Sequence, residues 1–503
     1  MTLRRAPGQL CKRALKGWRW SVAEGTAHWL PPALLDDPDA FLLHNPQQRP
    51  LKESLVRTAL IIPGLQGDLF LKQYKIRDFR DRWKYFLLPS KARREWMMAH
   101  QALAKGIPTP VPLAMAERRQ GCFLQDALLI TQAISPSSPL IELIPDGGNE
   151  ELLFQTARLL RQTHEAGLLH QDLHAGNILV GMDGKKLYLI DLHRSKLVRN
   201  VSKRRRLWNL AQFFYSLQAW LSPEAKRAFL QHYDAVEDLF KGGFDQGLKE
   251  IGWEEEKIGR RHIQSRTKRC LKESGGFFVA KEDGWQIWGR RGWKPQQLLK
   301  IVTKHEEIVA KGKEGLIKAD RRTAITLFDY KETRLCVKEY RYQGLWQQWK
   351  ERLRRSKARR GWLMGNGLVV RGVAGIIPQA LLVKRRRGLL QEAFFIMETP
   401  PGYVELDRYL VMAFAAQRED TRREAFLDAF AAFMAHLYLH RIIHRDLKTC
   451  NIMVQERADT WQFGLVDMDD VRLDKKISLR RLLKGLIQLH TSTPLFVEMG
   501  DRI

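Results

Sequence analysis

Two segments of the chain carry the same acidic and amide side chains at the same spacing. They read HQDLHAGN at residues 170–177 and HRDLKTCN at residues 444–451, and each is followed by an apolar run that ends in a second aspartate. A carboxylate can accept the proton of an attacking hydroxyl, while an amide oxygen and a second carboxylate are ligands suited to magnesium. Such a set of groups is typical of phosphoryl transfer, in which catalysis depends mainly on placing a hydroxyl against a metal-bound polyphosphate.

The spacing predicts a role for each of these residues. The first aspartate of each segment, Asp172 or Asp446, is expected to be the catalytic residue that orients the acceptor hydroxyl. The alternative is that each aspartate is an ordinary turn or cap residue, but two concordant copies in one chain argue against it. The predicted metal ligands, two in each copy, are Asn177, Asp191, Asn451 and Asp467.

A β-hairpin is predicted to bring the two metal ligands of the first copy together. Asn177 opens a short apolar strand, and Asp183 with Gly184 marks a turn. Residues 187–191 then form the returning strand, which ends at Asp191. Both ligands are therefore expected at one end of the hairpin.

The similarity between the two halves extends far beyond these segments. Lys72 and Lys338 each close an alternating apolar strand, and they lie 266 positions apart. The string SKARR at residues 90–94 recurs at 356–360 with the same offset, and the two catalytic aspartates differ by 274 positions. A period maintained over most of the chain indicates a tandem duplication. The predicted domains are residues 1–275 and 276–503.

The two lysines stand where a kinase binds the α- and β-phosphates of its nucleotide. Such a lysine is held by a helix glutamate, and Glu95 lies at the expected distance after Lys72. In the second copy the aligned residue is Gly361, which carries no charge and disfavours a helix. Lys338 is therefore expected to lack an anchor, and the second domain is expected to be weakened or regulatory.

No glycine-rich phosphate loop precedes either lysine. The equivalent strands carry Arg57 in the first copy and Arg322 in the second. These guanidinium groups either replace backbone amides as phosphate ligands or are solvated residues of an edge strand, and both interpretations stay open.

A known family combines these features. A glycine-free nucleotide loop, a Lys-x-Tyr strand at 72–74, the SKARR helix start and the HxDLHxxN segment together resemble the lipopolysaccharide core kinase family of Gram-negative bacteria. That family includes kinases of Kdo and of core heptose. The resemblance implies an α+β, protein-kinase-like fold, here as two tandem bilobal domains. Each would have an antiparallel-sheet N-lobe and a helical C-lobe, the second one shortened at its C-terminal end.

The resemblance also implies an activity. It is transfer of the γ-phosphate of ATP, with Mg²⁺, to a sugar hydroxyl of the lipid A-core glycolipid at the inner face of the inner membrane. His170 and His444 would hold the catalytic loops through backbone hydrogen bonds. His174 and His193 are assigned no ligand role, because a histidine beside a carboxylate more often orients it by a hydrogen bond.

The catalytic segments point to two kinds of acceptor. HQDLH looks like the loop of small-molecule kinases such as aminoglycoside and choline phosphotransferases, whereas HRDLK looks like that of Ser/Thr protein kinases. Within a dozen residues of Asp191 the chain enters a basic, helical segment, which leaves little room for a regulated activation segment and favours a sugar. Two alternatives stay open: a Ser/Thr protein kinase-like enzyme, and a catalytically silent scaffold or regulator in envelope biogenesis.

The charge of the chain requires an anionic partner. The formal net charge is +29, and basic residues gather at 203–206, 350–360 and 384–387. Each such residue contributes about 1 kcal/mol of attraction near anionic lipid, so an anionic membrane surface is the expected partner. Nucleic acid would suit the charge equally, but no recognition-helix, RNA-binding or zinc-finger motif accompanies it. No nucleic-acid partner is expected.

Other features of the sequence bear on location. No apolar run approaches the ~18 residues of a membrane span, and the first 20 residues lack the apolar segment of a secretory signal. The five cysteines are scattered without a Cys-x-x-Cys pair, which suits a reducing compartment. We therefore expect a cytoplasmic protein that is peripheral on the inner membrane.

Overall fold

The chain divides into two compact units, residues 1–259 and 260–503, called here the first and second unit. The turn at 183–184, most of the basic run at 350–360 and Arg387 lie outside the residues that the structure describes. The computed structural model describes residues 10–13, 17–45, 47–53, 57–76, 79–144, 150–181, 186–234, 239–240, 243–312, 314–342, 356–373, 375–386, 389–415, 420–458, 460–473 and 477–497.

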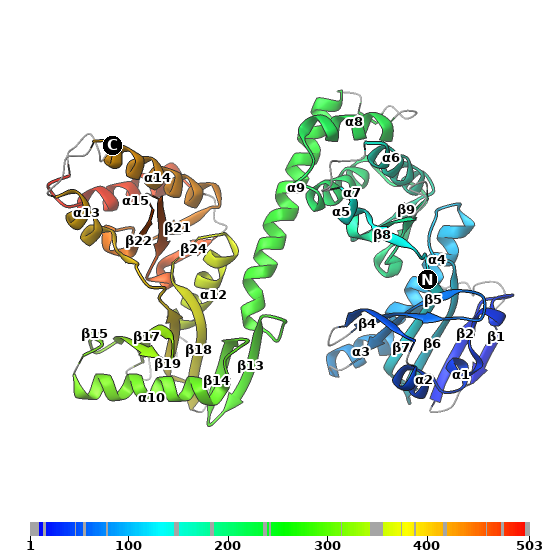
Figure 1. Cartoon of the computed structure of the whole chain (residues 1–503), viewed down its shortest axis with the longest axis horizontal. Coiled ribbons are helices and arrows are strands. Elements are labelled where there is room, and N and C mark those ends of the chain that lie inside the picture. Colours follow the sequence, from blue (N-terminus) through cyan, green and yellow to red (C-terminus); the bar gives the residue numbers. More distant parts are fainter. Residues whose placement is uncertain are drawn as a thin grey trace. The chain divides into compact units, whose positions relative to one another are not determined.

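A seven-stranded antiparallel sheet forms one lobe of the first unit (Figure 1), with the strand order β1-β2-β6-β7-β5-β4-β3. Both of its faces carry buried side chains. Along β5, Leu69 and Leu71 are buried on one face, and the alternation of a strand directs Lys72 and Tyr74 to the other. The strands are β1 (Leu10–Arg13), β2 (Trp18–Val22), β3 (Arg49–Glu53), β4 (Arg57–Pro63), β5 (Asp68–Lys75), β6 (Pro112–Gln120) and β7 (Phe123–Gln132).

Helices cover both faces of this sheet. Leu34 of α1 (Pro32–Asp36) packs in the core on the Leu71 face, joined by α2 (Pro38–His44), and α4 (Lys91–Ala104) packs Trp96 against Tyr74 on the other. The sequence predicted one helix in this lobe, the one that carries Glu95. The structure also has α1, α2 and α3 (Phe79–Leu87), which are too short for a clear apolar period.

The second lobe of the first unit is mainly helical. Strand β10 (Ile178–Gly181) pairs antiparallel with β11 (Leu187–Leu189), so the predicted hairpin is present. The helices pack around a core that includes Leu160, Phe213 and Phe214. The other elements are β8 (Ser137–Pro139), β9 (Leu168–Leu169), β12 (Lys196–Leu197), α5 (Leu140–Leu143), α6 (Glu150–Glu165), α7 (Lys203–Ser216), α8 (Pro223–Tyr233) and α9 (Phe244–Thr267).

The second unit repeats the sheet with the same strand pattern, β13-β14-β18-β19-β17-β16-β15. One long helix, α10 (Pro295–Lys311), packs on the face that α1 and α2 cover in the first unit, and α12 (Lys357–Val370) matches α4. The strands are β13 (Phe277–Glu282), β14 (Trp285–Arg290), β15 (Leu316–Ala319), β16 (Thr323–Tyr330), β17 (Thr333–Arg341), β18 (Ile377–Arg386) and β19 (Leu389–Glu398).

The helical lobe of the second unit contains the second catalytic segment. In Figure 1 the sheet and these helices form separate lobes of the unit, as in the first unit. Among the described residues no helix is both long and apolar enough to span a membrane. The elements are β20 (Val404–Glu405), α13 (Leu406–Phe414), α14 (Asp420–Leu439), β21 (Ile442–His444), β22 (Ile452–Arg457), β23 (Thr460–Leu465), β24 (Val471–Leu473) and α15 (Leu479–Ser492).

The division between the units falls inside α9. Residues after 259 belong with the second unit because they bond to its helix α12 and the turn that follows. The indole Nε1 of Trp362 donates to the carbonyl oxygen of Cys270 (3.0 Å), and Arg371 Nη1 donates to Thr267 Oγ1 (3.2 Å). The sequence comparison placed the boundary at residue 275 because recognisable similarity begins only near β13.

Candidate active site

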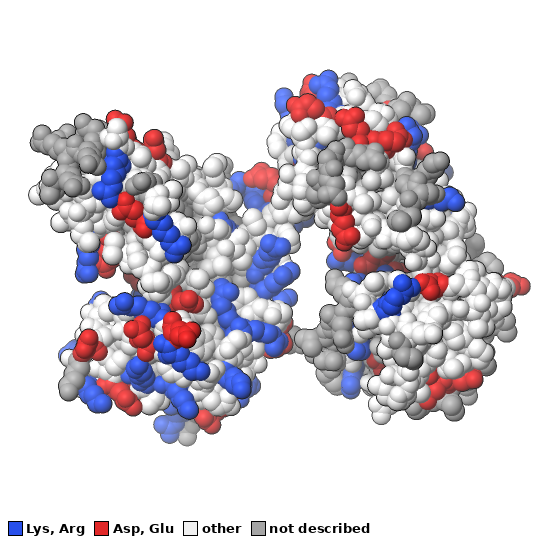
Figure 2. Space-filling view, viewed as in Figure 1, with Lys and Arg blue, Asp and Glu red and all other residues white. Residues whose placement is uncertain are grey.

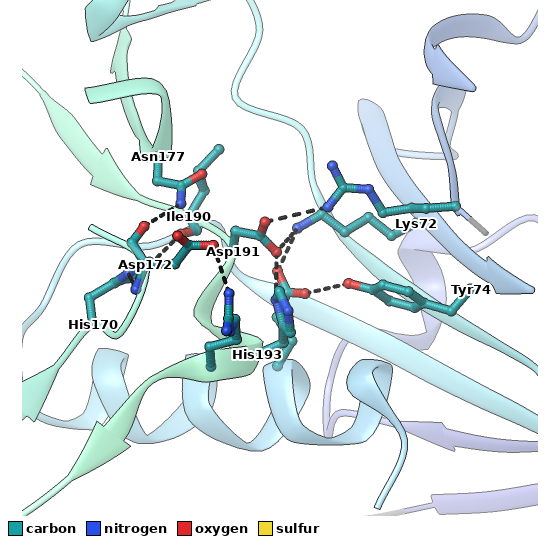
Figure 3. Close-up of polar contacts among 11 residues, drawn as sticks. Lys72, Tyr74, His170, Asp172, Asn177, Ile190, Asp191 and His193 are labelled. Carbon is teal, nitrogen blue, oxygen red and sulfur yellow. Dashed lines mark hydrogen bonds and ion pairs between the residues drawn. The ribbon is translucent and has the colours of Figure 1, made fainter. Parts of the chain in front are cut away.

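Lys72 lies at the centre of a charged cluster in the first unit (Figure 3). Its Nζ is 2.6 Å from Glu95 Oε1 and 3.4 Å from Asp191 Oδ1, and the lysine is only 6% exposed. Burial alone would lower the pKa of Lys72, but the carboxylates of Glu95 and Asp191 outweigh it, so the pKa is raised. The expected Lys72–Glu95 pair is present, and the ammonium stays charged at neutral pH.

Tyr74 completes the coordination of Glu95. It lies two residues beyond Lys72 on the same face of β5, and its hydroxyl donates to Glu95 Oε2 at 2.8 Å. Burial, followed by the Glu95 carboxylate, raises the pKa of Tyr74 well above its usual value, so the hydroxyl remains a donor. The sequence identified a Lys-x-Tyr strand but gave this tyrosine no role. The strand period was the available signal, because residues i and i+2 share a face.

Asp191 faces Lys72 from the far end of the hairpin. It has a left-handed backbone conformation (φ 61°), as does Asp467 in the second unit (φ 52°). This conformation is uncommon for a residue other than glycine and marks a backbone held by its surroundings. His193 Nδ1 lies 2.8 Å from its carboxylate and Arg57 Nη1 lies 3.4 Å away. Burial raises the pKa of Asp191, but His193, Lys72 and Arg57 together lower it far below the usual range.

His170 holds the catalytic loop through the backbone, as the family resemblance implied. Its Nδ1 accepts from the amide N–H of Asp172 (3.2 Å), which leaves Nε2 as the donor to the carbonyl oxygen of Ile190 (3.0 Å). Burial lowers the pKa of His170 and keeps the ring neutral, as this pair of bonds requires. Ile190 precedes Asp191, so one imidazole links the backbone at Asp172 to the backbone next to Asp191.

Two further residues support the loop from α6 and α7. Asn209 Nδ2 donates to the carbonyl oxygen of His170 (2.7 Å), and Asn209 Oδ1 lies 3.1 Å from Nε2 of His164. The other ring nitrogen of His164 lies 2.7 Å from the hydroxyl of Tyr233. Burial, as the main cause, lowers the pKa of His164 to about 4. No motif in the sequence identified this network, because its members come from three separate helices.

Asp172 lies at the open edge of the site. Its side chain is 45% exposed, and Arg194 Nη1 lies 3.3 Å from its Oδ2. Asn177 Nδ2 donates to the carbonyl oxygen of Asp172 (2.9 Å), which leaves the amide oxygen of Asn177 as the atom for a cation. The structure therefore brings Lys72, Asp172, Asn177 and Asp191, four distant residues, to one place, called here the first site (Figure 3).

Mg²⁺ fits these donors. It prefers oxygen ligands and usually takes one or two carboxylates together with water and phosphate oxygens, which matches Asp191 and Asn177. Ligand atoms of Glu95, Asp191 and His193 also lie within 4.8 Å of one another. Both oxygens of Glu95 are already bonded to Lys72 and Tyr74. His193 is bonded to Asp191, which agrees with the orienting role expected for it.

The second unit holds its lysine with a different carboxylate. Lys338 Nζ lies 2.5 Å from Asp467 Oδ1 and 3.0 Å from Asp469 Oδ1, and the hydroxyl of Tyr340 donates to the same Asp469 oxygen (3.3 Å). Burial lowers the pKa of Lys338, but Asp469 and Asp467 outweigh it and the pKa is raised. The expectation that Lys338 lacks an anchor was therefore wrong.

Aromatic side chains crowd the position in the second unit that corresponds to Glu95. A Cβ at Gly361 would lie 3.3 Å from the ring of Phe395 and 3.6 Å from Tyr340 Oη, so aromatic groups fill the space around this position. The anchor instead comes from Asp469, two residues after Asp467, where the first unit has His193. The sequence did contain this signal, because Asp469 lies 276 positions after His193, the same offset that separates Asp191 from Asp467. The prediction missed it because it looked for the partner of Lys338 only in the helix.

Two hydrogen bonds of the first site recur in the second. His444 Nε2 lies 3.0 Å from the carbonyl oxygen of Val466, and Asn451 Nδ2 donates to the carbonyl oxygen of Asp446 (2.8 Å). Lys448 Nζ lies 3.0 Å from Asp446, where the first site uses Arg194. We call Lys338, Asp446, Asn451, Asp467 and Asp469 the second site.

Arg57 and Arg322 differ in position. Arg57 pairs with Tyr74 across the β4–β5 ladder and reaches Asp191, whereas the residue opposite Tyr340 is Thr323. The sequence alignment was therefore shifted by one residue, which turns a strand side chain to the other face. Within the described part of the chain, the exposed side chain of Arg322 forms no ion pair with Asp467 or Asp469. The structure does not bring Arg322 to the second site.

Known proteins resemble both halves of the chain. The profile of the lipopolysaccharide kinase (Kdo/WaaP) family matches residues 63–233 and 314–499. The 3-deoxy-D-manno-octulosonic acid kinase of Xylella fastidiosa (strain M23) is 29% identical over 175 residues, which cover 33% of this chain and 69% of that protein. The lipopolysaccharide core heptose(I) kinase WaaP of Escherichia coli is 27% identical over 174 residues, 31% of this chain and 65% of that protein.

Two further similarities are to a human protein and to a solved structure. The human STE20-related kinase adapter protein beta is 33% identical over 113 residues, 22% of this chain, and the chain spans only about a quarter (27%) of that protein's length. A solved structure, "WaaP in complex with acyl carrier protein", is 22% identical and covers 46% of this chain and 97% of that chain, with a TM-score of 0.35.

Proposed function

Because the chain belongs to the lipopolysaccharide kinase (Kdo/WaaP) family, we propose that its first unit is an ATP-dependent, Mg²⁺-assisted kinase. Its acceptor is a sugar hydroxyl, on Kdo or heptose, of the lipid A-core. The observation that carries the proposal is the convergence of Lys72, Asp172, Asn177 and Asp191 at the first site. The protein acts from the cytoplasmic side, at the surface of the inner membrane.

Each group in the first site has a distinct task in this reaction. The ammonium of Lys72, fixed by Glu95, binds phosphate oxygens of the nucleotide, and Arg57 adds a second cation nearby. Asp191 and the amide oxygen of Asn177 hold Mg²⁺, which when bound neutralises charge on the phosphates. Asp172 accepts the proton of the sugar hydroxyl from the exposed edge of the site, with Arg194 orienting its carboxylate.

The chain after Asp191 supports a sugar acceptor. Helix α7 begins at Lys203, and the residues between them form one short helical turn and strand β12. A peptide acceptor is usually presented by a longer activation segment. The short segment after Asp191 thus argues against a peptide acceptor. A Ser/Thr protein kinase-like activity is the second candidate, because the HRDLK segment of the second site favours it.

We also propose that the two units, residues 1–259 and 260–503, are duplicated kinase domains. The shared strand order and the shared loop hydrogen bonds support this proposal. Asp469 restores the anchor of Lys338, so the second unit is proposed to bind nucleotide too. A catalytically silent scaffold remains the alternative for the whole chain.

Phosphate transfer to purified lipid A-core tests these proposals. Wild type, Asp172→Ala and Asp446→Ala are compared with labelled ATP and Mg²⁺. We expect transfer by wild type and a loss of several orders of magnitude in Asp172→Ala. If phosphate transfer were lost only in Asp446→Ala, the active site would be the second site and not the first. No transfer by a wild-type protein that still binds ATP would favour the scaffold.

A further inference from the structure

A basic pocket lies beside the second catalytic loop. It encloses about 350 Å³ between the end of β21, β24 and α15. Gln488 of α15 connects the pocket to the second site, because its Nε2 lies 3.5 Å from Asp446 Oδ1 and its Oε1 accepts from the amide of Leu447. The cationic residues in its lining are Arg445, Arg472, Arg481 and Lys484.

These cations exceed the anions that face them. Arg445 pairs with Asp470. Arg472 donates to the carbonyl oxygen of Val471 (3.0 Å), and its pKa is lowered by burial and then by the neighbouring cations Arg360 and Arg445. Arg481 and Lys484 form no ion pair with a carboxylate in the described part of the chain. Crowded cations around a concave surface attract an anionic group, and arginine matches phosphate especially well.

The neighbouring face of α15 is apolar and exposed. Leu479, Leu483 and Ile487 follow each other at four-residue intervals and are 70%, 48% and 61% exposed. Residues four apart lie on one side of a helix. Exposed apolar side chains beside a basic stripe are typical of helices that lie in the headgroup region of a membrane.

An apolar groove borders the same helix. It has a volume of about 350 Å³ and runs between α13, α14 and α15, where Leu410, Phe430, Leu486 and Ile487 contribute to its lining. Helix α15 therefore separates a cationic pocket from an apolar groove. A ligand that suits both has a phosphate at one end and hydrocarbon at the other.

We propose that the basic pocket and α15 form a binding site for an anionic membrane lipid. Arg481 and Lys484 bind the phosphate of its headgroup, and the acyl chains contact the exposed face of α15 and the apolar groove. This inference rests on the proposed function, because a kinase of a membrane glycolipid requires a surface that meets the membrane. It places that surface on the second unit. In the view of Figure 2, Lys and Arg side chains are also dense over the sheet-rich lobe of the second unit. An experiment must therefore separate binding by the basic pocket from attraction by the net positive charge.

Vesicle sedimentation of the full chain tests the basic pocket. The vesicles contain neutral phosphatidylcholine alone or mixed with phosphatidylglycerol, and only the mixed vesicles should retain the protein. The double variant Arg481→Gln/Lys484→Gln is expected to bind mixed vesicles about 30-fold more weakly, from ~1 kcal/mol per basic residue. The charge-preserving pair Arg481→Lys/Lys484→Arg should bind as wild type does.

A matched pair controls for overall charge. Lys300 and Lys311 are exposed basic residues of α10 in the same unit. Lys300→Gln/Lys311→Gln removes the same charge and should leave vesicle binding within about twofold of wild type, because it leaves the basic pocket unchanged. An equal loss in both pairs would show that binding follows net charge and would overturn the proposed site.

A second set of variants distinguishes a lipid from a soluble phosphate ligand. Leu483→Ser/Ile487→Ser should weaken binding at least tenfold, since apolar side chains leave the lipid layer. Ile317→Ser, at an isoleucine that is 60% exposed on β15, is the control and should have little effect. The lipid assignment would be overturned if the double serine variant bound vesicles as tightly as wild type and millimolar inorganic phosphate displaced the protein from them. That result would indicate a soluble phosphate ligand.

Failure of this inference can be separated from failure of the proposed function. Asp172→Asn and Asp446→Asn should still bind mixed vesicles as wild type does. The Arg481→Gln/Lys484→Gln variant should still transfer phosphate to detergent-solubilised acceptor. Vesicle binding without any wild-type transfer would contradict the kinase proposal alone, and transfer without vesicle binding would contradict the lipid site alone.

Discussion

The carboxylate of Asp469 lies 3.0 Å from the ammonium of Lys338. In the first unit the equivalent lysine is held by Glu95 of helix α4, whereas Asp469 lies two residues after Asp467 in the helical lobe. The two halves thus achieve the same charge pairing from different positions in the chain. A missing helix glutamate is therefore poor evidence that a kinase-like site is inactive.

Asp469→Asn should weaken ATP binding by the second site. Loss of a charged partner leaves the partly buried ammonium of Lys338 with Asp467 alone, at a cost of roughly 1.5–3 kcal/mol, or about tenfold or more in affinity. Isothermal titration in a Lys72→Ala background, which removes the first site, would measure it. Asp470→Asn is the control, because this neighbouring carboxylate pairs with Arg445 instead. Unchanged affinity in Asp469→Asn would contradict an anchoring role.

Glu95→Gln should damage the first site more than Tyr74→Phe. The glutamine removes the charge that fixes Lys72, and breaking a buried ion pair costs about 3–5 kcal/mol, reduced here because Asp191 remains. The phenylalanine removes one hydrogen bond of about 1 kcal/mol. Urea unfolding and the rate of phosphate transfer should both follow this order. Equal effects of the two variants would contradict a dominant role for the Lys72–Glu95 charge pair.

Arg57→Gln and Arg322→Gln should differ although the sequence analysis treated the two arginines as equivalent. Arg57 reaches Asp191, and its loss should raise the KM for ATP about tenfold, as expected for one charged hydrogen-bonding group. Arg322 lies outside the second site because of the one-residue shift in register, so Arg322→Gln should leave nucleotide binding unchanged. The first variant would be measured by steady-state kinetics and the second by titration with ATP. Weaker ATP binding by Arg322→Gln would contradict the strand register seen in the structure and support the equivalence expected from the sequence.

His164 should make the first unit sensitive to acid. Its pKa is lowered to about 4 in the folded protein, against about 6.5 in an unfolded chain, so the unfolded state binds the proton first. The stability that the neutral ring provides is complete above pH ~6.5 and is lost as the pH falls towards 4, by about 3 kcal/mol. The difference in unfolding free energy between wild type and His164→Gln should therefore narrow over this range. A constant difference would mean that the ring is not buried in its neutral form.

Spacing in the sequence was enough to predict the hairpin and the Lys72–Glu95 pair, and the family resemblance implied the role of the loop histidines. Each of these depends on residues of one strand or loop, or on a lysine and glutamate whose separation is typical of the family. The sequence could not predict features that depend on exact register or on packing between distant elements. The position of Arg322 depends on one residue of strand register, and the His164–Asn209 contact joins two helices.

The anchor of Lys338 is an intermediate case. Asp469 was visible in the repeat, but the crowding of aromatic groups around Gly361 can be seen only in the structure. Helices α1 and α2 were missed for another reason: each is shorter than the window over which an apolar period can be recognised.

The central claim is that the first site transfers phosphate to a lipid A-core sugar. The most direct measurement is mass spectrometry of the lipid A-core from a strain that lacks this gene, complemented with wild type or with Asp172→Asn. We predict that wild type restores a core heavier by one phosphate group and that Asp172→Asn, expressed at the same level, does not. An identical core in all three strains, or full restoration by Asp172→Asn, would contradict the account.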